Sequence, residues 1–63
     1  MERLYRAKAD SGRDYITFLF KSENRGNSNK NKEDARKAYK KVHGHSIEII
    51  STERAEFTGE KVY

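Results

Sequence analysis

NKEDARKAYKKVHG, residues Asn31–Gly44, is the stretch that decides the fold, because its apolar residues recur at the spacing of one helix face. Those residues are Ala35, Ala38, Tyr39 and Val42, at positions i, i+3, i+4 and i+7. Basic side chains fall between them and point the other way. Asn31 is a suitable N-cap, and Gly44 is suited to the left-handed conformation that ends a helix. The pattern therefore predicts one amphipathic helix with a basic outer face.

Two stretches before this helix and one after it alternate between apolar and polar residues, as strands do when one face covers a core. They are Leu4–Ala9, Tyr15–Lys21 and Ser46–Thr52. The turn at 10–13 contains a glycine and joins the first two strands as a β-hairpin. Residues 22–30 form a polar loop without an apolar side chain to pack.

The order of elements predicts a single α+β domain of ββαβ type over residues 1–57. It consists of a small three-stranded sheet with one helix packed on one face. Pairing of the last strand with the first gives a fully antiparallel sheet of order 2-1-3, which we favour. The alternative places the most apolar strand, the second, in the centre. Residues 58–63 have little to pack with and are expected to form a flexible C-terminal tail.

The alternation assigns each strand residue to a core face or an outer face. The core is expected to contain Tyr5, Ala7, Ile16, Phe18, Phe20, Ala35, Ala38, Tyr39, Val42, Ile47 and Ile49. The outer face is expected to carry Leu4, Arg6, Lys8, Tyr15, Leu19 and Ile50. Because one helix covers only one face, this outer set is a possible interface for a partner or for a second copy of the chain. Ordinary exposed apolar residues on a half-solvated sheet are the alternative.

Positive charge is concentrated in the middle of the chain. The net charge is +4, and residues 21–45 carry eight basic and three acidic groups, a net of +5. The candidate contact residues for a nucleic acid or an acidic protein are Arg25, Lys30, Lys32, Arg36, Lys37, Lys40 and Lys41. The alternative is a solvated helix face that keeps a small protein soluble.

Neither a metal site nor a catalytic site is indicated. The chain has no cysteine and two histidines, whereas zinc takes three or four protein ligands. A Ser46–His45 pair lacks the pocket that a nucleophile needs, and the acidic residues are scattered. We therefore expect a protein that is not an enzyme and that needs no cofactor. The longest apolar-rich run, Tyr15–Phe20, is too short to span a bilayer, so we expect no membrane contact and a cytoplasmic location.

Three segments carry a resemblance to a known group of proteins: ITFLFKSEN at 16–24, EDARKAYKKVHG at 33–44 and IEII at 47–50. In order and type they resemble the hairpin, helix and last strand of small bacteriophage proteins that bind and inhibit a host enzyme, including the phage inhibitor of bacterial RNA polymerase. The resemblance covers most of the chain as architecture and includes no diagnostic motif. It implies a small ββαβ fold and protein–protein inhibition, and it assigns no functional residue.

The leading hypothesis is a small binding module that engages nucleic acid through its basic helix and loop. Lysine is a point charge, so contacts to phosphate without reading of base sequence are expected. The main alternative is a phage-type inhibitor or adaptor that binds an acidic surface of a host protein. A homodimer that buries the open sheet face is a third possibility.

Overall fold

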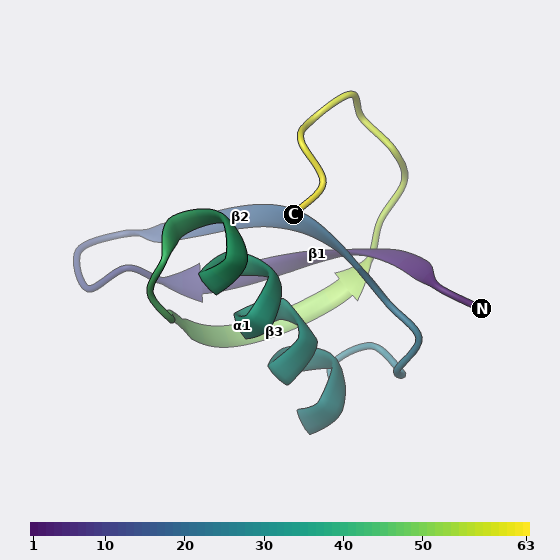
Figure 1. Ribbon diagram of the computed structural model, residues 1–63, viewed down its shortest axis with the longest axis horizontal. Coiled ribbons are helices and arrows are strands. Elements are labelled where there is room, and N and C mark those ends of the chain that lie inside the picture. Colours follow the sequence, from purple (N-terminus) through teal and green to yellow (C-terminus); the bar gives the residue numbers. More distant parts are fainter.

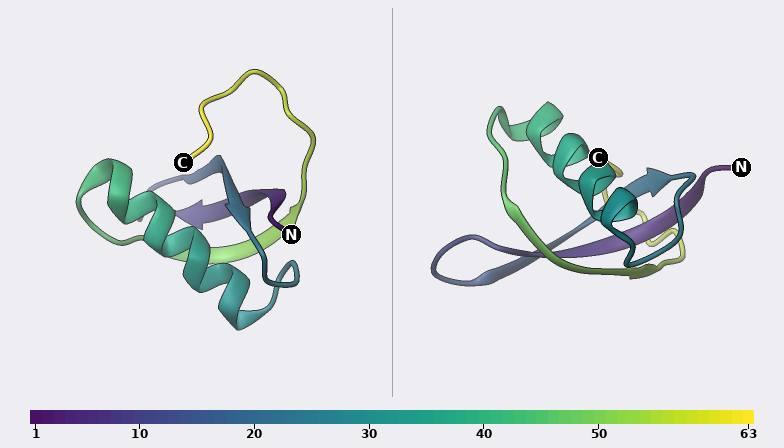
Figure 2. Two further views of the ribbon diagram at one scale, coloured as in Figure 1. Left: turned by 45° about the vertical axis from the view of Figure 1, so that its right-hand side comes forward. Right: turned by 90° about the horizontal axis from the view of Figure 1, so that it is seen from below.

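The computed structural model describes all 63 residues, which form two strands, a helix and a third strand (Figure 1). The elements are β1 (Arg3–Asp10), β2 (Tyr15–Ser22), α1 (Asn29–His43) and β3 (Glu48–Arg54). β1 lies in the middle and pairs antiparallel with both neighbours, in the order β2-β1-β3. α1 crosses one face of the sheet (Figure 2). The predicted α+β class and the 2-1-3 strand order are therefore confirmed.

Aromatic rings of β2 form the centre of the core beneath α1. Phe18 and Phe20 are buried, with ring centroids 6.1 Å apart, and Phe18 also lies 5.6 Å from the ring of Tyr39 on α1. The buried cluster comprises Tyr5, Ala7, Ala9, Phe18, Phe20, Ala35, Tyr39 and Ile49. Ile16, Ala38 and Ile47 pack against it partly buried. Small alanines on β1 and α1 let the helix lie close to the sheet, so the rings of β2 fill the remaining space.

A β-bulge in β3 changes which residues face the helix. Ala9 pairs with Ile49 and Lys8 pairs with Ser51, so Ile50 is the extra residue between two pairs. If the alternation continued past Ile49, Ser51 would lie on the helix side and Thr52 on the outer side, but the bulge reverses this. After it, Thr52 turns to the helix side and is buried. The side chain of Thr52 is thereby available to the loop before α1.

Both ends of α1 are capped, and the helix begins earlier than expected. The N-cap is Ser28, whose hydroxyl accepts a hydrogen bond from the backbone N–H of Asn31 at 3.1 Å. Asn31, predicted as the cap, lies inside the helix and is fully buried. At the other end Gly44 has φ of 83° and donates its N–H to the Lys40 carbonyl. No helix in the structure combines the length and the apolar character needed to cross a membrane.

The C-terminal segment, residues 55–63, leaves β3 and returns to β2 (Figures 1 and 2). The backbone N–H of Tyr63 donates to the Leu19 carbonyl at 2.7 Å, and Val62 forms a parallel bridge with Leu19. The Tyr63 ring stacks on Phe18 with centroids 4.8 Å apart. Residues 58–63 were expected to form a flexible tail, whereas the structure places Val62 and Tyr63 against β2, the strand that carries most of the core.

The predicted exposure of Leu19 on the open sheet face is wrong, because its side chain is fully buried. Its direct partner on β1 is Arg6, and the Arg6 guanidinium binds the Glu60 carboxylate through two hydrogen bonds of 2.7 and 3.2 Å. The C-terminal segment therefore runs beside Leu19 on this side of the sheet. Strand alternation alone does not show such a cover, since the covering residues lie about forty positions later in the chain.

The ion pair between Arg6 and Glu60 predicts a titration shift. Two hydrogen bonds from the Arg6 guanidinium and one from the Thr58 hydroxyl lower the pKa of Glu60 below its ordinary value. Because the pKa is lowered in the folded state, the pair stabilises the fold at pH values above the pKa of Glu in the unfolded chain, about 4.3. This stabilisation is lost as the pH falls through the pKa of Glu60 in the folded protein. Carboxyl NMR titration should place Glu60 below 4.3. Arg6→Gln should raise that midpoint, and an unchanged midpoint would contradict the pairing.

Candidate nucleic-acid interface

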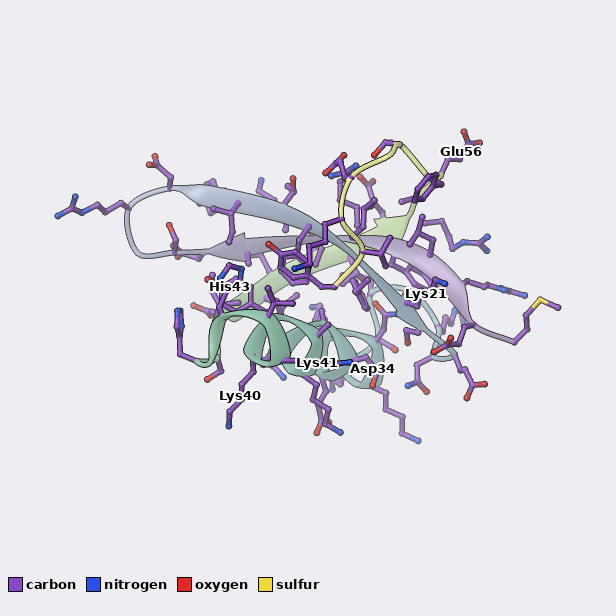
Figure 3. All side chains as sticks on the ribbon, turned by 45° about the horizontal axis from the view of Figure 1, so that its top comes forward. Lys21, Asp34, Lys40, Lys41, His43 and Glu56 are labelled. Atoms are coloured by element: carbon purple, nitrogen blue, oxygen red, sulfur yellow. The ribbon has the colours of Figure 1, made fainter.

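The outer side of α1 gathers most of the cations that the sequence singled out. Asn31, Ala35 and Tyr39 are the buried residues of the helix, so the opposite side faces solvent. We define the basic helix face as Lys30, Arg36, Lys37, Lys40 and Lys41, all of which are exposed. Figure 3 shows Lys40 extending away from the sheet. Lys32, also predicted to contact a partner, is half-buried on the flank of this face.

Few acidic groups neutralise the basic helix face. Its single ion pair joins Lys37 to Glu33 at 3.8 Å, one turn apart on the helix, and both side chains are largely exposed. Such a pair contributes little and is screened by salt. Arg36, Lys40 and Lys41 have no carboxylate oxygen within 4.0 Å. The face is therefore a surface of uncompensated positive charge.

The second acidic residue of the helix, Asp34, is turned away to the loop that precedes α1. Its carboxylate accepts hydrogen bonds of 2.6 Å from the Ser22 hydroxyl and from the Asn24 side-chain amide. The buried Asn31 amide donates to the Asn24 carbonyl at 3.1 Å. This corrects the expectation that residues 22–30 have nothing to pack against. Because these contacts are polar, hydrophobic patterning did not reveal them.

Two further contacts fix the same loop to the sheet. The Asn27 backbone N–H donates to the Thr52 hydroxyl at 2.6 Å, and the Thr52 N–H donates to the Asn27 side-chain oxygen at 3.3 Å. Gly26 lies against the ring of Tyr5, where an added Cβ would come within 2.9 Å of a ring carbon. A side chain at position 26 therefore has no room unless the ring moves. The loop therefore contacts α1, β3 and β1.

Arg25 belongs to this loop and lies apart from the basic helix face. It lines an open cavity of about 480 Å³ together with Arg3 at the start of β1 and Arg54 at the end of β3. We call this cavity the arginine pocket. Tyr5, Glu23 and Gly26 also contribute to its wall. Arg3 and Arg54 were not predicted as site residues, because their approach depends on the β1–β3 register, in which Tyr5 pairs with Arg54.

The open sheet face, predicted as a possible interface, carries apolar groups that are separated from one another. Leu4 is half-buried, and Ile50 is exposed at the bulge. Lys8 lies over the exposed Tyr15 ring at 4.5 Å from its centroid. Arg6 is paired with Glu60, as described above. With Leu19 covered, this face retains only separate apolar groups among charged ones, which is ordinary for a solvated sheet.

The histidines join an aromatic cluster at the C-terminal end of α1. His43 lies 4.3 Å from the Tyr39 ring by centroids, and its Nε2 is 3.1 Å from the Tyr63 hydroxyl. His45 lies edge-on to Tyr39 at 5.4 Å. No three His, Cys, Asp or Glu side chains come together as a possible metal site. The positions of both rings are explained by packing on Tyr39 and Tyr63.

Two cationic surfaces thus emerge from the fold, the basic helix face and the arginine pocket. The pocket is built from β1, β3 and the loop before α1, whereas the helix face comes from one element. Comparison of this chain with protein-family models, with curated proteins and with solved structures found no match.

Proposed function

We propose that this protein is a binding module for nucleic acid, which it holds through phosphate contacts of the basic helix face. The observation that carries the proposal is the set of exposed, uncompensated cations on one side of a capped helix. Phosphates of a nucleic acid present regularly spaced negative charge to such a surface, and binding releases the counterions that those phosphates hold. The affinity therefore comes from charge.

Base-specific reading is not part of the proposal. Four of the five residues of the basic helix face are lysines, which act as point charges and lack the bidentate geometry by which arginine reads guanine. The face carries no exposed aromatic ring on which a base would stack. We therefore expect nearly equal affinity for strands of different sequence.

Replacement of three lysines tests the helix face directly. The triple variant Lys37→Gln, Lys40→Gln and Lys41→Gln should bind DNA at least about tenfold more weakly at about 50 mM salt. The slope of log affinity against log salt should become shallower by roughly 2.7, because each phosphate contact on duplex DNA contributes about 0.9. Fluorescence anisotropy over a salt series measures both quantities. Circular dichroism should show an intact helix, since the side chains are exposed and glutamine resembles lysine in helix propensity.

A matched variant separates the helix face from net charge. Lys8, Lys21 and Lys61 are exposed lysines outside α1, so their replacement by Gln removes the same charge elsewhere. This control should lose much less affinity. Equal losses in both triple variants would remove the special role of the helix, and no binding by the wild type at about 50 mM salt would refute the proposal.

An acidic protein is the competing partner for the same face, as expected for an inhibitor or adaptor. A pull-down from lysate with and without nuclease distinguishes the two. Under our proposal, nuclease abolishes capture. A protein that stays bound after nuclease treatment and is released by the lysine triple variant would favour the inhibitor instead.

A further inference from the structure

Three arginines from separate parts of the chain line the arginine pocket. Arg3 and Tyr5 are two residues apart on β1 and share a face of the sheet, while Arg54 is the partner of Tyr5 on β3. The Arg54 guanidinium lies over the Tyr5 ring at 5.8 Å from its centroid. Arg25 joins them from the loop before α1. The volume of about 480 Å³ lies within the range of small-ligand sites.

None of these three arginines has an acidic partner. The two ion pairs of the protein are Arg6 with Glu60 and Lys37 with Glu33, so no carboxylate oxygen lies within 4.0 Å of a pocket guanidinium. Among the lining residues, which also include Met1, the charged side chains are those of three arginines and of Glu23, a net of two positive side-chain charges. Like charges around one cavity repel one another, and a bound anion relieves the repulsion.

Two parts of the pocket lining, the Tyr5 ring and the loop before α1, are held in place by contacts within the protein. The Tyr5 ring is held on one side by Phe20, with centroids 5.8 Å apart, and it meets Gly26 at its margin. Asn24 and Asn27 tie the two ends of the same loop to α1 and β3. The ring is nearly buried, so it does not offer a face to a base. Recognition therefore falls to the guanidinium groups.

We infer that the arginine pocket binds a phosphomonoester, in particular the terminal phosphate of a nucleic-acid strand held by the basic helix face. Guanidinium groups match phosphate oxygens with paired hydrogen bonds. A terminal phosphate carries a charge of about −1.5 to −2 at neutral pH, close to the opposite of the net side-chain charge of the pocket, whereas an internal phosphodiester carries only one negative charge. The pocket therefore favours an end over the interior of a strand.

A nucleic acid is favoured as the source because the loop that contributes Arg25 to the pocket leads directly into α1, which carries the basic helix face. Arg25 lies in the pocket, Ser28 caps the helix three residues later, and Lys30 is the first cation of the face. A strand whose end occupies the pocket has further phosphates to place on α1. This choice of source rests on the proposed function, while the affinity of the pocket for a phosphomonoester does not.

The test compares two DNA strands of one sequence that differ only in a terminal phosphate or hydroxyl. By fluorescence anisotropy the phosphorylated strand should bind at least about fivefold more tightly. The preference should diminish at pH 5, because the second pKa of a phosphate is about 6. Arg3→Gln with Arg54→Gln should abolish the preference. A control that removes two charges elsewhere, Arg13→Gln with Lys61→Gln, should keep it, and circular dichroism should show that each variant is folded.

Other outcomes separate failure of the pocket from failure of the proposed function. Equal affinity for both strands, or loss of the preference in the control, would overturn the pocket proposal and leave the helix face intact. The lysine triple variant should bind both strands more weakly by the same factor and should retain the preference for the phosphorylated strand.

Two small probes address the pocket itself by arginine NMR signals. Inorganic phosphate and a nucleoside monophosphate should shift the Nε–H signals of Arg3, Arg25 and Arg54, and a nucleoside without phosphate should not. Shifts by these probes without any strand binding would support the pocket and refute the proposed function. A phosphoserine peptide that needs the pocket, together with no preference for phosphorylated strands, would overturn the nucleic-acid source.

Discussion

Phe18→Ala should leave the protein largely unfolded at room temperature. The Phe18 ring is buried and lies between rings from three parts of the chain, Phe20 of β2, Tyr39 of α1 and Tyr63 of the C-terminal segment. Truncation of a buried phenylalanine to alanine costs about 3–5 kcal/mol. A domain of this size, without a disulfide, rarely has more stability than about 3–5 kcal/mol. Circular dichroism should show loss of the helix signal and no cooperative melt.

Phe57→Ala is the matched control for this prediction. It makes the same change in a ring that is 74% exposed, in the C-terminal segment. Its melting temperature should stay within a few degrees of the wild type, because surface substitutions usually change stability by no more than about 0.5 kcal/mol. If Phe18→Ala unfolded cooperatively at the melting temperature of the wild type, the faces of β2 would be assigned incorrectly.

Leu19→Lys is expected to have the second-largest effect, on a face of the sheet that no helix covers. Removal of a buried leucine side chain typically costs about 2–5 kcal/mol, and an ammonium group left in its place needs water. The protein gains that water either by unfolding or by release of the C-terminal segment. The Tyr63 N–H, which is bonded to the Leu19 carbonyl, should lose its protection from hydrogen exchange in either case. The amides within α1 distinguish the two, because they lose protection only if the protein unfolds.

Leu19→Met provides the comparison, since it preserves volume and apolar character and usually costs less than about 1.5 kcal/mol. Lys21, two residues along the same face, is exposed and shows that a lysine is compatible with this strand where nothing covers it. If Leu19→Lys melts like the wild type with a protected Tyr63 amide, the C-terminal segment is not what buries Leu19.

The elements that were predicted correctly are those with a regular repeat. The helix and three strands follow from periods of 3.6 and 2, and these fix the faces of β1, β2 and α1. The burial of Phe18, Phe20 and Tyr39 follows directly from that repeat. Exposure of the basic helix face followed for the same reason, because cations at the intervening positions point away from the core.

The features that were missed depend on contacts between distant residues. One extra residue in β3 exchanged the faces of Ser51 and Thr52, and no local pattern marks a bulge. The loop before α1 is fixed by amide and hydroxyl groups, which read as solvent-exposed residues in a sequence. The arginine pocket combines residues 3, 25 and 54, and only the strand register and the loop path bring them together.

The short parallel bridge of Val62 with Leu19 also covers part of a sheet edge that could otherwise pair with another molecule. β2 is an edge strand and the most apolar one, so its unpaired N–H and C=O groups would otherwise invite a strand from another molecule. Val62 and Tyr63 occupy the middle of that edge. The opposite edge, on β3, is interrupted by a bulge and ends in charged residues. Both edges of this small sheet are therefore poor templates for fibrils, although by different means.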